Sequence, residues 1–203
     1  MILQRFNGFT KMTDALGVVP RRLSPERRKA EILEAAHRLL VREGLHGFSL
    51  DAVAREAGVA NSLPRHYFGT YGALLASCAE EMLERVIEAL VSDPGIPLRQ
   101  RLSRYLDVLA SEPWGHKLWM TGGFGHQELM DLALPARRAI LEASTGRRYE
   151  KLSTRQRLHV SGLLGYVERI VDDWIGSGLT DREIVIDVLV DGMEKLRAEV
   201  SSV

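Results

Sequence analysis

This sequence has a single cysteine, no long apolar run and no net charge. Cys78 is the single cysteine among 203 residues, so no disulfide can form within the chain. No stretch approaches the roughly 18 uninterrupted apolar residues of a membrane helix. Polar residues interrupt the first twenty positions, which argues against an export signal. We therefore expect a cytoplasmic protein with no membrane segment.

Charge is balanced overall but unevenly distributed. Lys and Arg total 27, as do Asp and Glu, which excludes a uniformly basic nucleic-acid-binding surface. Residues 1–69 carry 11 basic and 7 acidic residues, a net charge of +4, whereas residues 70–203 carry 16 and 20, a net charge of −4. Many solvated helices are as basic as the first third, so this patch indicates nucleic acid only beside a binding motif.

The first helix is predicted to follow an irregular beginning. Residues 1–20 show no sustained periodicity, and we expect a flexible leader over residues 1–22. A helix should begin after Ser24, because serine caps helix N-termini and Pro25 suits the first helical position. Apolar residues then recur every three or four positions until Gly44, which predicts an amphipathic helix.

Helical spacing continues through the rest of the chain. A short second helix is predicted after Ser49, ending before Gly58, and a third between Val59 and Phe68. Further helices are predicted over about 71–91, 98–109, 114–120, 129–143, 158–175 and 184–196. No strand pattern competes with them, and 45% hydrophobic residues supply a core. The predicted fold is all-α, with about nine helices and no internal repeat.

The second and third helices have the spacing of a helix-turn-helix motif. Ala54 would let the two helices cross closely, Gly58 follows at the turn, and Val59 would fill the space between the helices. Helical hairpins with no role in DNA binding use alanine and glycine in the same way. The spacing alone therefore leaves both interpretations open.

Short runs along the N-terminal third carry a family resemblance. They are Ile32-Leu33-Glu34-Ala35-Ala36, Leu39-Leu40, Gly44, Phe48-Ser49, Val53-Ala54-Arg55-Glu56-Ala57-Gly58-Val59, His66-Tyr67-Phe68-Gly69 and Leu74-Leu75. Over about residues 24–78, without a gap, this sequence resembles the DNA-binding domain of the TetR family of transcriptional regulators.

The resemblance implies a one-component repressor with two domains. A three-helix helix-turn-helix domain over residues 23–69 would bind double-stranded DNA, and a helical domain over residues 70–203 would bind an unidentified small-molecule effector and form a homodimer. Such a dimer places two third helices about 34 Å apart in the major groove, so the implied operator is a palindrome.

The resemblance also implies candidate DNA contacts. The Ser49 hydroxyl would cap the second helix and reach a phosphate, with a cap alone as the alternative. Asn61 could read adenine through a bidentate pair, and Arg55 would either contact phosphate or remain solvated. The candidate set is Ser49, Arg55, Asn61, Ser62, Arg65, His66, Tyr67 and Tyr71.

Three positions depart from the family pattern. Pro64 stands inside the third helix and disfavours helical geometry in the residue before it, so we expect this helix to start late or bend. With Pro64 as the first helical residue, Asn61 and Ser62 would lie in the preceding turn. Arg65 replaces a common tyrosine, and Tyr71 a lysine that commonly contacts phosphate. We expect altered specificity or weaker binding rather than lost function.

A pocket is predicted where large side chains surround a glycine-rich segment at Gly122, Gly123 and Gly125, although an ordinary core with a bend is the alternative. The candidate wall residues are Tyr105, Trp114, Trp119, Met120, Phe124, His126, Met130, Tyr166 and Trp174. His116 and His126 lack metal-ligand spacing, so no metal or cofactor is expected.

The last two predicted helices are the expected dimer surface, because the family pairs them with those of a second subunit in a four-helix bundle. They carry apolar residues on more than one face, which favours an interface, although the core of one subunit would use the same residues. The candidates are Gly162, Gly165, Val167, Ile170, Val171, Val185, Val188 and Leu189.

Two other classes of function compete with a repressor. An enzyme would need paired reactive groups, but the sequence has no nucleophile elbow, phosphate loop or clustered His and Cys ligands, so we do not expect one. The other is a regulator-shaped binder of small molecules or proteins in which Pro64 has ended specific DNA binding. Salt-dependent binding to a specific duplex separates this class from the repressor.

Overall fold

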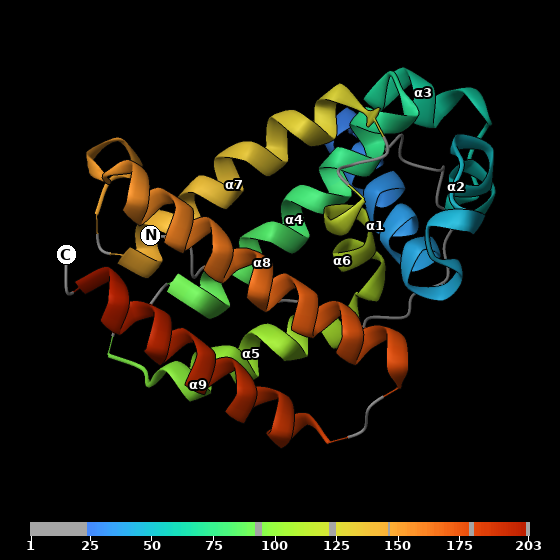
Figure 1. Cartoon of the computed structure of the whole chain (residues 1–203). Helices are drawn as coiled ribbons and strands as arrows, with labels where there is room; N and C mark the ends of the chain where they lie inside the picture. The colour runs from blue at the N-terminus through green and yellow to red at the C-terminus, as the bar shows by residue number, and fades with distance from the viewer. Residues whose placement is uncertain (1–23, 92–94, 122–124, 146, 179–180, 202–203) are drawn as a thin grey trace.

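A computed structural model describes residues 24–91, 95–121, 125–145, 147–178 and 181–201, and within these ranges the chain is all-α with no strand (Figure 1). The α-helices are α1 (Pro25–Glu43), α2 (Leu50–Ala57), α3 (Ser62–Phe68), α4 (Tyr71–Val91), α5 (Leu98–Ser111), α6 (Pro113–Met120), α7 (Gln127–Thr145), α8 (Thr154–Ser177) and α9 (Arg182–Ser201). The predicted fold class is confirmed. The expected leader lies outside the described residues.

Local capping explains where several helices begin. The Ser24 hydroxyl accepts a hydrogen bond from the Arg27 backbone N–H at 3.3 Å, and the Thr70 hydroxyl accepts one from Ala73 at 2.9 Å at the start of α4. Asp181 caps α9 by accepting from the Ile184 backbone N–H at 3.3 Å. Each cap satisfies a backbone donor that has no partner within its helix.

Two hydrophobic cores share helix α4. The first joins α1–α3 to the N-terminal half of α4, α6 and the beginning of α7. The second joins the C-terminal half of α4 to α5, α8 and α9. We call residues 24–69 the N-terminal unit and residues 70–201 the C-terminal body. Because α4 contributes side chains to both cores, it connects the two regions mechanically.

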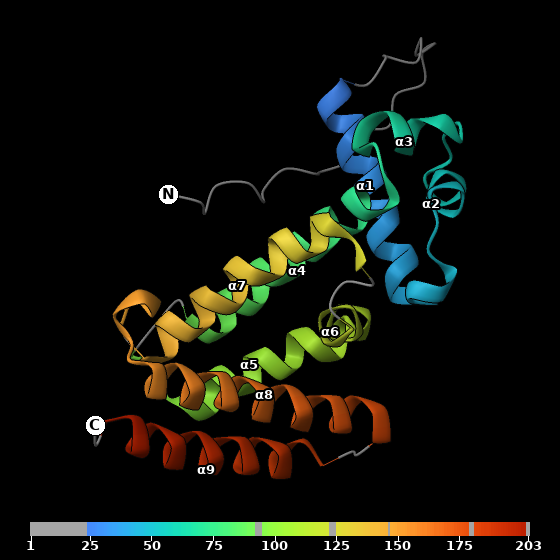
Figure 2. The same ribbon diagram turned by 45° about the horizontal axis from the view of Figure 1, so that its top comes forward.

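The helices of the C-terminal body extend away from the N-terminal unit (Figure 2). Helices α4 and α7 run side by side, and α8 and α9 form a pair at the edge of the body away from α2 and α3. Among the described helices, none is long and apolar enough to span a membrane.

Candidate DNA-binding surface and effector cavity

The turn between α2 and α3 has the geometry of a complete helix C-cap. Gly58 adopts a left-handed conformation with φ of 65°. Its N–H donates to the Arg55 carbonyl at 3.2 Å, and the Val59 N–H donates to the Ala54 carbonyl at 2.9 Å. This pair of bonds ends α2 sharply and redirects the chain into α3, as a helix-turn-helix requires.

Helix α3 begins earlier than the sequence predicted. It starts at Ser62, so Pro64 is its third residue rather than its first, and the expectation of a late start was wrong. The first four N–H groups of a helix have no partner within it, so the N–H that proline lacks is not missed there. The Pro64 ring is fully buried. It therefore anchors the first turn of α3 against the N-terminal unit.

Most of the candidate DNA contacts on α2, α3 and their N-caps are exposed. Six of them are exposed: Ser49, Arg55, Asn61, Ser62, Arg65 and His66. The Ser49 oxygen accepts a hydrogen bond from the Ala52 N–H at 3.1 Å, which leaves its own proton available to donate to a phosphate. No ion pair to Arg55 or Arg65 occurs among the described residues, so both can pair with phosphates.

The two tyrosines of the candidate set are less exposed. Tyr67 is half-buried and its ring packs edge-on against His66, with ring centroids 5.1 Å apart. The Tyr71 ring lies between Phe48 and His126, at centroid distances of 5.5 and 5.2 Å. Burial raises the pKa of Tyr71. Its ring therefore contacts both the N-terminal unit and the C-terminal body.

The N-terminal unit has a small net charge, and ion pairs engage some of its cations. Residues 24–69 contain seven Lys or Arg and six Asp or Glu, so only +1 of the +4 found in residues 1–69 belongs to this unit. Arg38 and Arg42 both pair with Glu56, at 3.3 and 2.8 Å. Of the cations with no ion pair among the described residues, Arg55 and Arg65 lie on α2 and α3, and Arg27 and Lys29 lie on α1.

The C-terminal body contains a cavity of about 110 Å³. Side chains of α4 through α9 line it, and most are apolar, including Met82, Val86, Leu102 and Leu163. Two predicted wall residues, Tyr105 of α5 and Trp119 of α6, do line it.

Polar groups of the cavity wall come from three helices. His116 of α6 is only 3% exposed, and its Nε2 has no hydrogen-bond partner among the described residues. Burial lowers the pKa of His116 against the opposing effect of Asp172 and Glu168, which favours the neutral ring. Glu168 of α8 accepts a hydrogen bond from Trp119 Nε1 at 2.5 Å. Burial and the Glu168 charge together raise the pKa of Tyr105.

The other predicted wall residues lie elsewhere. Trp114 is buried in the first core, Met120 and Met130 are exposed, and Phe124 lies outside the described residues. The remaining three, His126, Tyr166 and Trp174, do not line the cavity. Residue type indicated large side chains near a pocket, but packing directs most of them into the core or onto the surface. The sequence also gave no signal for Glu168.

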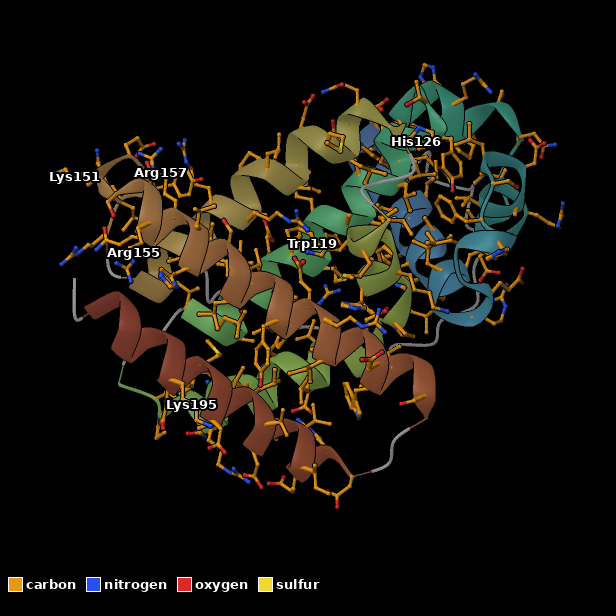
Figure 3. The ribbon with its side chains drawn as sticks, in the orientation of Figure 1. Trp119, His126, Lys151, Arg155, Arg157 and Lys195 are labelled. Carbon is orange, nitrogen blue, oxygen red and sulfur yellow. The ribbon has the colours of Figure 1, made fainter. Side chains whose placement is uncertain are left out.

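A polar contact joins the beginning of α7 to Thr70, the residue that directly follows the N-terminal unit. The Thr70 hydroxyl donates to Glu128 Oε1 at 2.7 Å. Gly72 allows this approach, because a Cβ there would lie 2.7 Å from Glu128 Oε2 and 3.0 Å from His126 Nδ1. Figure 3 shows His126 beside the N-terminal unit and Trp119 in the middle of the body.

The predicted dimer residues on α8 and α9 form two groups that differ in burial. Val167, Val171, Val185 and Leu189 are buried and Ile170 is half-buried, all in the second core of a single chain. By contrast, Gly162, Gly165 and Val188 are exposed. The buried group packs inside the chain, and the exposed group lies on its surface.

Exposed apolar side chains mark the outer face of the α8–α9 pair. Leu158, Ile184 and Val188 are 69%, 59% and 42% exposed. A Cβ at Gly162 or Gly165 would meet no atom within 4 Å. This face is therefore open and partly apolar.

Comparison with known proteins supports the family resemblance. Residues 32–78 match the family described as bacterial regulatory proteins, tetR family. The HTH-type transcriptional regulator PksA from Bacillus subtilis is 33% identical over 72 residues, which cover 36% of this chain and 35% of PksA. The chain thus matches about a third of the length of that relative.

Solved structures match a larger part of the chain. A tetR-family transcriptional regulator from Streptomyces coelicolor has a TM-score of 0.72 and 19% identity, over 89% of this chain and 90% of the other. The multidrug binding protein EbrR complexed with imidazole has a TM-score of 0.61 and 22% identity, over 81% and 94%. At these identities the likeness establishes the fold.

Proposed function

We propose that this chain is a cytoplasmic transcriptional repressor of the tetR family of bacterial regulatory proteins, which binds DNA as a homodimer and releases it when a small molecule occupies the cavity. The observation that carries the proposal is the exposed α2–α3 face, in which the Gly58 turn and the buried Pro64 hold a short helix outward. This role is that of a regulator rather than an enzyme.

DNA recognition would combine phosphate and base contacts. Ser49 and Arg55 on α2 would position the unit on the phosphate backbone. Asn61, Ser62 and Arg65 at the beginning of α3 would reach base edges in the major groove, where asparagine pairs with adenine and arginine with guanine. With few uncommitted cations on the unit, specificity would depend more on base contacts than on bulk charge.

A homodimer would use the outer face of α8 and α9. Leu158, Ile184 and Val188 would bury their exposed area against the second subunit, and the open positions at Gly162 and Gly165 would let the helices approach closely. Two-fold symmetry then predicts a palindromic operator.

Effector release would pass through α4. Met82, Leu83 and Val86 of α4 line the cavity, while Leu74 and Leu75 of the same helix lie in the core shared with the N-terminal unit. A ligand that favours a shifted α4 would change the separation of the two α3 helices. The fold shared with EbrR, which was solved with imidazole bound, supports a ligand-binding role for the body.

Fluorescence anisotropy with duplex DNA from upstream of the gene tests this function. At 150 mM salt, a level at which backbone-only affinity is much reduced, we expect the chain to bind this duplex more tightly than a shuffled one. Arg65→Ala should weaken specific binding by about tenfold or more, because a bidentate arginine is lost. Arg104→Ala, a change at an exposed arginine on α5, is the matched control and should have no effect.

Equal affinity for the two duplexes would contradict the proposal. It would instead favour a ligand or protein binder that has lost specific DNA recognition.

A further inference from the structure

We propose that Trp119 and Glu168 form a binding site for an organic cation in the wall of the cavity, and that Arg137 occupies this site until a ligand displaces it. The inference rests on the proposed effector-binding role of the body and specifies the class of ligand. It comes from the contacts of three side chains, on α6, α7 and α8.

The three side chains form a compact cation site. The Arg137 guanidinium lies over the Trp119 ring, 5.0 Å from its centroid, and donates from Nη2 to Glu168 Oε1 at 3.1 Å. The same carboxylate oxygen accepts the Trp119 indole N–H. An aromatic face held beside a carboxylate is an arrangement that attracts cations.

Glu168 can be reached from two sides. It lines the cavity together with Trp119, and it also lines a separate hollow of about 660 Å³ between α7 and α8 together with Arg137. Arg137 therefore approaches the carboxylate from the outer side, whereas a ligand would approach from the cavity. The Glu168 side chain is 13% exposed, so whichever cation pairs with it is largely screened from water.

Arg137 is held in a way that permits exchange. Its side chain is 42% exposed, and its Nε is buried without a hydrogen-bond partner among the described residues. Moving into water would satisfy that N–H at little desolvation cost. A ligand cation would then keep Glu168 paired, so the exchange leaves no buried charge alone.

The rest of the cavity wall favours a cation with an apolar body. Glu168 and Arg101 are the charged residues that line it among the described residues. Arg101 already donates to the Leu90 carbonyl at 3.0 Å, where the C-terminal end of α4 favours positive charge. An anionic ligand would be repelled by Glu168, whereas an ammonium group would pair with it.

Displacement of Arg137 would also release a contact between α7 and α8. Helix α7 packs along α4 and carries Glu128, which bonds to Thr70, the residue that directly follows the N-terminal unit. Loss of the Arg137–Glu168 pair would therefore loosen a helix that contacts both regions.

Calorimetric titration of the full chain without DNA tests the site. The probes are phenyltrimethylammonium and tert-butylbenzene, which have the same shape and differ in one positive charge. We expect the cation to bind about tenfold more tightly, because a ring and a carboxylate face it. Glu168→Gln, which keeps an acceptor for Trp119, should remove this preference.

Arg137 provides the decisive variant. Arg137→Gln should strengthen cation binding by about tenfold, because no internal cation competes for Glu168. Arg137→Lys should remain close to wild type. Arg138→Gln changes the neighbouring exposed arginine, which pairs with Glu150 at 2.7 Å, and should have no effect.

Two results would overturn the proposal: equal wild-type affinity for the two probes, or unchanged or weaker cation binding by a folded Arg137→Gln variant. Circular dichroism and thermal melts establish that each variant folds. Operator binding is measured separately, so loss of specific DNA recognition would contradict the proposed function without altering the probe result.

Discussion

The proposed DNA-binding surface and the cavity differ in how far apart their residues lie in the sequence. The exposed contacts of the N-terminal unit fall between Ser49 and His66, on two adjacent short helices. The cavity takes its wall from six helices, between Met82 and Met193. The first site depends on local caps and a turn, whereas the second exists only when distant helices pack. Sequence patterns therefore predict the candidate contacts on α2 and α3 far better than they predict the wall of the cavity.

The largest expected effect tests whether the two regions fold independently. Leu40→Ala in the first core and Leu189→Ala in the second should each lower the free energy of unfolding by about 2–5 kcal/mol, because each removes a fully buried side chain. Since α4 belongs to both cores, we expect one cooperative transition in urea, followed by circular dichroism. Two separate transitions in either variant would show that α4 does not couple the regions.

The next effect concerns the outer face of the body. Leu158→Glu should raise the dimer dissociation constant by about tenfold or more, since it places a charge in an apolar contact. Analytical ultracentrifugation measures this constant. Glu34→Gln, at an exposed position on α1, serves as the control. A dimer that is unaffected by Leu158→Glu would place the interface elsewhere.

A smaller effect is expected where the two regions meet. Thr70→Ala removes the cap of α4 and the bond to Glu128, and should cost about 1 kcal/mol of unfolding free energy for the lost cap. Thr70→Ser keeps the hydroxyl and should remain near wild type in chemical denaturation. Equal losses in the two variants would assign the effect to the methyl group rather than to the hydrogen bonds.

The smallest effect is a pH dependence inside the cavity. Because burial holds the pKa of His116 below its ordinary value of 6.5, the unfolded chain binds more protons once the pH falls below that value. Acidification from about pH 7.5 to 5.5 should therefore destabilise the wild type more than His116→Asn. Replacing the exposed His46 by Asn is the control for denaturation at the two pH values. An identical pH dependence of stability in wild type and His116→Asn would contradict a lowered pKa of His116 as its cause.

Local signals account for what the sequence predicted correctly. Ser24, Ser49 and Gly58 act on backbone groups within a few residues, so their roles follow from residue type and position. The sequence predicted Pro64 as the first residue of the third helix, because proline disfavours helical geometry in the residue before it. In the structure Pro64 is the third residue of α3, since a helix tolerates proline throughout its first turn.

Long-range packing accounts for what the sequence could not show. Val171 and Val188 are the same residue type on neighbouring helices, yet one is buried in the core and the other is exposed. Only the packing of α4, α5, α8 and α9 around the second core distinguishes them. Likewise Glu168 has no sequence signal, because its partners Trp119 and Arg137 come from other helices.

Selection of bound duplexes from a random pool tests the central claim most directly, since it assumes no operator. The exposed α3 helices of a symmetric dimer predict enrichment of one inverted repeat whose half-sites lie about one helical turn apart. Arg65→Ala should reduce that enrichment. Recovery of sequences no different from the starting pool would contradict the account.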